Sequence, residues 1–148
     1  MKKSIPLSKR AYIAGFLDGD GSIYVRAKPN SDYRYKFQIA PYVVLFQSAK
    51  NREKFKEICD LINLGYIRER KDGILEYIIN KIDDIKGFLM LVRPFVILKR
   101  KQVEMTLKII ELKNKIKNKD DFNALMELID SFRELNYSKK RKRRALTP

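Results

Sequence analysis

The stretch Ile13-Ala14-Gly15-Phe16-Leu17-Asp18-Gly19-Asp20-Gly21 decides the fold of this chain. Its apolar spacing predicts a helix over residues 9–18. Ala11, Gly15 and Gly19 recur at every fourth position and therefore share one helix face. A glycine inside a helix costs about 1 kcal/mol relative to alanine. The stripe of small residues thus predicts that another backbone packs closely against this helix.

Asp20 follows the predicted end of this helix, where unpaired carbonyls already make a negative potential. A carboxylate at that place is unfavourable unless a cation is bound, and carboxylate and carbonyl oxygens suit a hard divalent ion. Two such helices packed about a two-fold axis would bring two Asp20 carboxylates together, as phosphodiester hydrolysis by metal ions requires. Spacing alone leaves a second interpretation open, a helix stop followed by an Asp-Gly turn.

Charge and composition narrow the partners and the metal ligands. The 148 residues hold 33 Lys and Arg against 18 Asp and Glu, which favours nucleic acid first and an acidic membrane surface second. No apolar run approaches the roughly 18–20 residues of a spanning helix, and no signal peptide follows Met1, so we expect a soluble, intracellular protein. Cys59 stands alone in an apolar helical pattern and is expected in the core. With no histidine, any metal must have oxygen ligands, which suits Mg²⁺, Mn²⁺ or Ca²⁺.

The hydrophobic periodicity predicts an α+β chain, folded as one domain over 1–148 with an N-terminal arm (1–7) and a basic tail (137–148). After the first helix we expect strands at 23–28 and 34–47, with Pro41 at an edge or bulge, a helix at 51–64, a hairpin of 66–70 and 74–80, a helix ending before Pro94, and helices at 99–117 and 121–135. We expect helices to begin at Ser8, at Asp83 or Asp84, and at Asp120. The first helix is expected to stop at Gly19 and Gly21, and the second at Gly65.

Residues 12–23 resemble the LAGLIDADG motif of homing endonucleases. Residues 28–30, 65–68, 93–102 and 135–139 are similar to corresponding segments of single-motif, homodimeric members. The resemblance implies an αββαββα fold with a four-stranded antiparallel saddle over DNA, motif helices at the dimer interface, and additional C-terminal helices. It implies a homodimeric homing endonuclease that makes double-strand cuts at a long pseudo-palindromic DNA site, with Mg²⁺ as cofactor and Mn²⁺ or Ca²⁺ able to substitute in binding. No small-molecule cofactor or membrane partner is expected.

The same resemblance implies roles for individual residues. The last motif acid, Asp20, and the carbonyl before it, on Gly19, would hold the metal. Gln47 and Lys99 occupy positions that flank the metals in similar enzymes, and Arg52 is favoured over Lys50 and Asn51 as the basic residue near Gln47. Asp18, the first motif acid, is expected to be structural. The implied dimer interface consists of Ala11, Tyr12, Ala14, Gly15, Leu17, Asp18 and Gly19.

The polar faces of the strands predict how DNA would be read, because a two-stranded ribbon fits the major groove. Arginines would pair with guanine, Gln38 or Asn30 with adenine and Glu76 with cytosine, while Val44 and Ile78 would touch thymine methyl groups. The basic tail would contact phosphates, although a nuclear localisation signal or a disordered tail would look the same. The DNA-binding set is Tyr24, Arg26, Lys28, Asn30, Tyr33, Lys36, Gln38, Ala40, Tyr42, Val44, Arg68, Arg70, Glu76, Ile78, Ser138, Lys139 and Lys140. The alternative is that this face of the sheet is only solvated and charged and does not bind DNA.

A second function class remains open: a nucleic-acid-binding protein that does not cleave, such as an intron RNA splicing maturase on the same fold. A membrane-surface protein would need amphipathic aromatic anchors that the chain lacks. Similar endonucleases are encoded in introns of organelle and archaeal genes, which implies archaeal cytoplasm or an organelle (chloroplast or mitochondrion) as the location.

Overall fold

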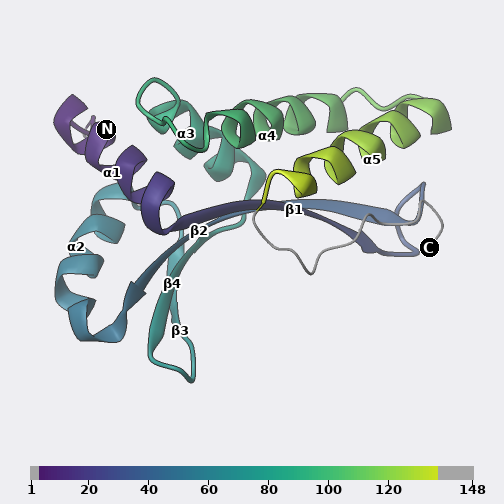
Figure 1. The fold of residues 1–148 in the computed structure, drawn as a ribbon. Coiled ribbons are helices and arrows are strands. Elements are labelled where there is room, and N and C mark those ends of the chain that lie inside the picture. The colour runs from purple at the N-terminus through teal and green to yellow at the C-terminus, as the bar shows by residue number, and fades with distance from the viewer. Residues whose placement is uncertain (1–3, 137–148) are drawn as a thin grey trace.

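The computed structural model describes residues 4–136, and in that part four strands form one antiparallel sheet in the order β1-β2-β4-β3 (Figure 1). The elements are α1 (Leu7–Asp20), β1 (Gly21–Pro29), β2 (Phe37–Ser48), the 3-10 turn η1 (Ala49–Asn51), α2 (Arg52–Ile62), β3 (Tyr66–Glu69), β4 (Ile74–Ile79), α3 (Ile82–Val92), α4 (Arg100–Lys113) and α5 (Lys119–Glu134). The predicted α+β element order and four-stranded antiparallel sheet are confirmed.

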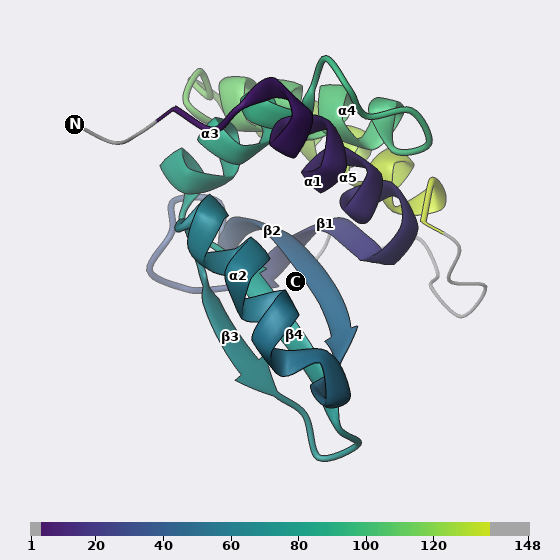
Figure 2. The same cartoon turned by 90° about the vertical axis from the view of Figure 1, so that its left-hand side faces the viewer.

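The core lies between one face of the sheet and the helices. Side chains alternate across a strand, so apolar residues at every second position of β1 all point to the same face. Figures 1 and 2 show the helices gathered on that side of the sheet, while the other face carries no helix in the described part of the chain. The buried residues come from the strands and from every helix, among them Leu17, Ile23, Val25, Val43, Leu45, Phe55, Phe88, Val103 and Ile129.

Pro41 marks where the sheet narrows. β2 pairs with β1 from Phe37 to Leu45, and Pro41 lies opposite Val25. β4 reaches β2 only from Val43 onward, so the missing amide hydrogen of proline leaves no ladder bond unmade. The expected edge position is therefore confirmed locally, although β2 is central elsewhere. Beyond this point the β3–β4 hairpin turns away from the helices and gives the sheet its saddle shape (Figure 1).

The ends of α1 differ from the prediction. The helix begins at Leu7, directly after Pro6, and has no side-chain cap. Ser8 is therefore not the N-cap, and Leu7 belongs to the helix and not to the N-terminal arm. A proline before the first turn supplies a fixed φ instead of a hydrogen bond. The helix also continues through Gly19 to Asp20, and Gly21 ends it. A Cβ on Gly21 would lie 2.7 Å from Leu17 Cδ1 and 2.8 Å from the Leu17 carbonyl oxygen, which explains the glycine.

The end of α2 also differs from the sequence-based expectation. Asn63 ends α2 in the left-handed conformation with φ 52°, two residues before the expected Gly65. Gly65 has a different role, because a Cβ there would lie 2.1 Å from the Ile78 carbonyl oxygen. Its missing side chain allows the backbone that leads into β3 to lie directly against β4.

The expected acidic caps of two later helices are wrong by two or three positions. Lys81 precedes α3, so Asp83 and Asp84 lie in its first turn instead of capping it. For α5 the cap is Asn118, which accepts the Asp121 N–H, and Asp120 lies in the first turn of the helix. Carboxylates in a first turn still favour the helix, because they face the positive end of its dipole.

No helix within residues 4–136 is long and apolar enough to cross a bilayer.

Candidate functional site

The C-terminal end of α1 is held by Asp18. Its carboxylate accepts backbone N–H groups from Ile97, Leu98 and Lys99 at 2.8, 3.0 and 3.0 Å. Lys99 Nζ donates back to the Asp18 carbonyl at 2.9 Å. Asp18 thus satisfies three amide groups of the segment that leads into α4 and fixes the end of α1 against the start of that helix. This geometry agrees with the expected structural role of Asp18.

Asp20 lies two residues further along, and its surroundings are different. The residue is exposed at the last position of α1 and its carboxylate has no hydrogen-bond or ion-pair partner within residues 4–136. No group of three or more His, Cys, Asp or Glu able to hold a metal occurs in the same part of the chain. One subunit therefore offers the Asp20 carboxylate and nearby helix-end carbonyls, including that of Gly19. These are oxygen donors suited to Mg²⁺, but they are fewer than the ion's full set of ligands.

Gln47 is the second-last residue of β2. Gly21 pairs with Leu45, so two more residues of strand carry Gln47 past the start of β1 toward the end of α1. Its Oε1 accepts the Ser48 N–H at 2.9 Å and Asn51 Nδ2 at 3.2 Å. The amide nitrogen of Gln47 remains available as a donor to a water or a phosphate.

Arg52 is not brought to Gln47. Its guanidinium forms an ion pair with Glu69 on β3, and Asn51 occupies the place beside Gln47. The Lys50 backbone N–H donates to Ser48 Oγ, and its side chain is exposed. Of the four catalytic candidates, Asp20 ends α1 and Lys99 bonds to the Asp18 carbonyl in the same turn, while Gln47 lies two strand positions beyond Leu45. Arg52 pairs with Glu69 on β3 instead.

The stripe of small residues on α1 lies open. Ala11, Gly15 and Gly19 are exposed, and a Cβ on either glycine would meet nothing within 4 Å. Ala14 and Leu17 are completely buried in the subunit's own core, so assigning them to a dimer interface was wrong. Both follow the other periodic face of the same helix, which the sheet covers.

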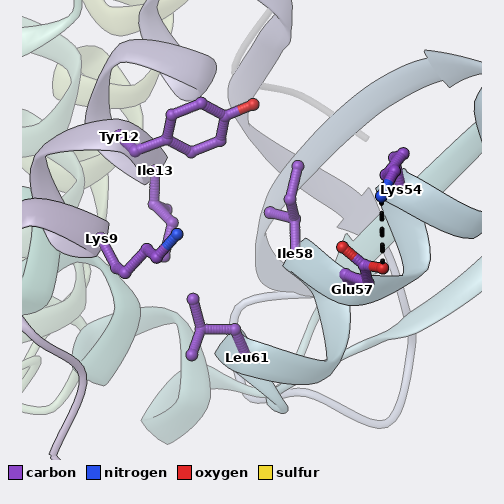
Figure 3. A pocket seen from close by; sticks show the side chains of 7 residues that line it. All are labelled: Lys9, Tyr12, Ile13, Lys54, Glu57, Ile58 and Leu61. Atoms are coloured by element: carbon purple, nitrogen blue, oxygen red, sulfur yellow. Dashed lines mark ion pairs between the residues drawn. The ribbon is translucent and has the colours of Figure 1, made fainter.

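Exposed apolar side chains flank this stripe at both ends. Beside its N-terminal half, a hollow of about 250 Å³ separates α1 from α2. Figure 3 shows Tyr12 and Ile13 on one side of it and Ile58 and Leu61 on the other. Tyr12 is 57% exposed. Beside the C-terminal end, Ile97 and Leu98 are 76% and 75% exposed even though Asp18 holds their backbone.

The helix-free face of the sheet carries most of the predicted DNA-binding side chains. Residues directly opposite in an antiparallel pair share a face. The cross-strand pairs that define it are Tyr24 with Tyr42, Arg26 with Ala40, Lys28 with Gln38, Ser22 with Val44, Val44 with Ile78, and Glu76 with both Phe46 and Arg68. Tyr66, 50% exposed and opposite Ile78, joins this face and was missed by the sequence analysis. It lies two residues before Arg68, so strand alternation could have found it.

Two expected contacts on this surface, those of Val44 and Ile78, need correction, and the expected strand position of Lys36 needs one as well. Val44 and Ile78 lie on the helix-free face but are only 2% and 8% exposed, so neither side chain is open to a thymine methyl group. They pack against each other at the centre of the saddle, apart from the main core. Lys36 lies outside β2 in the turn before it, with φ 67°, and its Nζ lies 3.4 Å from the Ser31 carbonyl. Ser138, Lys139 and Lys140 lie outside the described residues.

The remaining expected residues lie at the outer end of β1 and β2 or on the hairpin. Asn30 turns the chain after β1, where its Oδ1 accepts the Asp32 N–H at 3.0 Å. Tyr33 follows in that turn and is 42% exposed. On the hairpin, Arg70 pairs with Asp72 at 2.6 Å. The polar positions therefore extend along the whole saddle, from the turn at its outer end to the tip of the hairpin.

Comparison with known proteins gives independent support for these features. The family model described as LAGLIDADG endonuclease matches residues 13–92. The chain is 38% identical over 132 residues to DNA endonuclease I-CreI of Chlamydomonas reinhardtii, covering 88% of this chain and 80% of that protein. It is 32% identical over 136 residues to DNA endonuclease I-CvuI of Chlorella vulgaris, covering 90% and 83%.

The fold has a matching counterpart among solved structures. A crystal structure of I-CvuI in complex with the I-CreI target in 2 mM Mg, with the DNA not cleaved, superimposes with a TM-score of 0.83. The two chains are 29% identical, and the match covers 91% of this chain and 86% of the other. The sheet, the motif helix and the C-terminal helices thus form one shared architecture.

Proposed function

Because the chain belongs to the LAGLIDADG endonuclease family, in its single-motif homing branch, we propose that it is a site-specific DNA endonuclease. It cuts both strands of a long pseudo-palindromic site as a homodimer and uses a divalent cation, with Mg²⁺ as the expected ion. The two curated relatives are named DNA endonucleases, and the matched I-CvuI structure contains DNA and was obtained with Mg.

The end of α1 carries this proposal. Asp18 is fully engaged by backbone amides, whereas Asp20, two residues away, is exposed without a partner in the described chain. An unpaired carboxylate at a helix C-terminus is unfavourable by itself, so a cation there relieves a local electrostatic cost. The all-oxygen donor set of Asp20 and the Gly19 carbonyl fits Mg²⁺. A second copy is needed to complete it.

The open face of α1 supports the homodimer. The side-chain-free positions at Gly15 and Gly19 allow the same helix of a second copy to approach closely. The exposed apolar residues at both ends of this stripe would be buried in such a contact. Two copies related by a two-fold axis then place two Asp20 carboxylates side by side and continue the saddle across a pseudo-palindromic site.

Each nearby side chain has a defined task in hydrolysis. A bound divalent ion supplies an activated water and stabilises charge on the phosphate oxygens. Lys99, tied to the Asp18 carbonyl, holds a fixed positive charge beside the scissile phosphate. Gln47, with its oxygen already occupied, donates from its amide nitrogen and orients a water or a phosphate oxygen. Arg52 would join them only after leaving Glu69.

Cleavage of a randomised duplex library in Mg²⁺, compared between the wild type and Asp20→Asn, tests the proposal. We expect double-strand cuts at one enriched sequence that need the metal and vanish in the variant. Sequence-selective binding by both proteins without any cutting would instead support the maturase-like alternative. Sedimentation tests the dimer, which should run at twice the 17.5 kDa subunit mass; a strict monomer on target DNA contradicts the shared site.

A further inference from the structure

Four side chains of the helix-free face pack into one cluster, formed by Tyr24, Arg26 and Lys28 of β1 and Tyr42 of β2. The rings of Tyr24 and Tyr42 stack with their centroids 5.0 Å apart and their planes 21° from parallel. The guanidinium carbon of Arg26 lies 5.3 Å from one ring centroid and 5.5 Å from the other. We call the two rings the tyrosine platform, because Arg26 lies almost equally over both.

The register of β1 and β2 explains why this cluster forms. Tyr24 and Tyr42 are directly opposite, so their rings meet on the same face. Arg26 is opposite Ala40, whose methyl group leaves room for the longer side chain to fold back over the rings. Lys28 Nζ donates to the Tyr42 hydroxyl at 2.7 Å and fixes the orientation of that ring. A cation is attracted to the negative face of an aromatic ring, so the stacked position of Arg26 is favourable.

Arg26 also differs from the other arginines on this surface in its free donors. Arg68 pairs with Glu76 at 3.3 Å, and Arg70 pairs with Asp72 at 2.6 Å and with Glu76 at 3.7 Å. Arg26 is exposed and forms no ion pair within residues 4–136. A guanidinium held over a ring still has N–H groups that point away from it and are able to donate. Arg26 is therefore the arginine whose donors are both oriented and unoccupied.

We propose that Arg26 determines a guanine at one position in each half of the DNA site, and that Tyr24 and Tyr42 are positioning residues that hold its guanidinium for this contact. The inference rests on the proposed function as a site-specific DNA endonuclease. Guanine presents two acceptors, O6 and N7, in the major groove, and the fork of an arginine matches both. Adenine presents an N6 amino donor where guanine has O6, so the same fork meets a donor and loses a bond.

The platform lowers the cost of this contact. A free arginine side chain must give up rotamer freedom when it forms a bidentate bond, whereas Arg26 is already confined over two rings. Its positive charge and that of Lys28 both lack a carboxylate partner in the described chain, which leaves this part of the saddle ready for a polyanion. Orientation and charge at this cluster thus point to base recognition by Arg26 itself.

The test selects bound duplexes from a randomised library in Ca²⁺ and sequences them for the wild type and for Arg26→Leu. The wild type is expected to enrich guanine at one position per half-site by about 5- to 150-fold over adenine, the range of a bidentate contact. Arg26→Leu keeps an apolar side chain on the rings but has no donor for O6 or N7, so the preference at that position should disappear while the others remain. A selected duplex with 7-deazaguanine there should bind the wild type more weakly and Arg26→Leu unchanged.

Platform variants test the positioning role separately. Tyr42→Leu should lower the guanine preference about 2- to 5-fold, the range of an exposed cation–ring interaction, whereas Tyr42→Phe keeps the ring and should retain it. Tyr24→Leu and Tyr24→Phe form the same pair on the neighbouring strand. Lys108→Gln removes an exposed charge from α4 on the helix-covered side and should leave the preference unchanged. Thermal unfolding of each variant verifies that the fold is intact.

The outcomes separate this inference from the proposed function. A wild-type protein that enriches no sequence overturns both. An enriched site whose base preferences are all unchanged in Arg26→Leu overturns the role of Arg26 and leaves the endonuclease proposal standing. A uniform loss of affinity across all sequences would assign Arg26 to a phosphate and also contradict the inference. Equal preferences in Tyr42→Leu and Tyr42→Phe would overturn the role of the platform.

Discussion

Asp18 and Lys99 bond to each other twice: Asp18 Oδ1 accepts the Lys99 backbone N–H at 3.0 Å, and the Asp18 carbonyl accepts Lys99 Nζ at 2.9 Å. The pair connects residues 81 positions apart in the sequence. It holds the last turn of α1, which carries Gly19 and Asp20, against the segment that leads into α4. A structural acid and a candidate catalytic lysine therefore act as one joint beside the proposed metal site.

Replacing Asp18 with alanine should destabilise the fold. The N–H groups of Ile97, Leu98 and Lys99 lose a charged acceptor, and we expect the free energy of unfolding to fall by about 2–3 kcal/mol. Asp20→Asn should leave stability unchanged or slightly raised, because it removes an unpaired charge from a helix C-terminus. Urea unfolding of both variants measures the difference, and equal losses would contradict the division of roles between the two acids.

Gly15→Leu should separate folding from dimer formation. A Cβ at Gly15 meets nothing within 4 Å in the subunit, so stability should hold or rise by up to about 1 kcal/mol from better helix propensity. Across a two-fold helix contact the same side chain overpacks, which should weaken the dimer about 10- to 100-fold and abolish cleavage. Sedimentation equilibrium measures the dimer.

Gly87→Leu is the matched control for this experiment. Gly87 is also exposed within a helix, α3, and a Cβ there would likewise meet nothing within 4 Å. It should show the same gain in stability with no change in self-association. A dimer that tolerates Gly15→Leu as well as Gly87→Leu would show that the open stripe on α1 is not the interface.

The strands were predictable because their signal is local. Alternation in β1 places Ile23 and Val25 in the core and Arg26 outside, and it needs no knowledge of the neighbouring strands. The helix caps were less predictable, because several polar residues near each helix start offer equivalent hydrogen bonds. Asn118 and Asp120 lie two residues apart, and the backbone entering α5 decides which of them caps it.

The surface contacts that were wrong depend on partners distant in sequence. Val44 is buried because β4 brings Ile78 beside it, and the pattern of β2 contains no trace of that pairing. Arg52 is drawn away from Gln47 by Glu69 on the following hairpin. The tyrosine platform likewise arises from the register of β1 and β2, which sets Tyr24 opposite Tyr42. Such features follow from tertiary pairing and lie beyond local periodicity.

Tyr77→Phe should loosen the connection between α2 and β3. The buried phenol oxygen of Tyr77 accepts N–H groups from Leu64 at 2.9 Å and Gly65 at 2.7 Å. Removing the oxygen leaves both donors without this acceptor, which should lower the free energy of unfolding by about 1–2 kcal/mol. Hydrogen exchange at Leu64 and Gly65 should accelerate in the variant. Unchanged protection of both amides would contradict this role.

Alkaline pH should destabilise the wild type partly through Cys59. Burial, followed by the nearby Asp60 charge, raises the pKa of the Cys59 thiol from 9.0 to about 12. The unfolded chain loses this proton first, so stability present below pH 9 declines as pH rises toward 12. Cys59→Ala should show a shallower decline over that window, apart from a constant loss caused by the vacated volume. Parallel curves of unfolding free energy against pH for the two proteins would contradict the shifted pKa.

Glu76→Gln tests how the hairpin arginines are used. Glu76 lies within 3.3 Å of Arg68 and 3.7 Å of Arg70 and neutralises part of their charge. If the arginines are then free to contact phosphates, binding to random duplex should tighten several-fold. The slope of log affinity against log salt, measured between 50 and 200 mM, should steepen by the equivalent of about one to two phosphate contacts. Glu104→Gln breaks a similar ion pair with Arg93, 2.6 Å long, between α3 and α4, and should leave DNA binding unchanged.

If Glu76 instead accepts from the amino group of cytosine, its variant loses one base preference and shows no gain on random duplex. The two results assign the carboxylate either to charge balance within the hairpin or to base recognition.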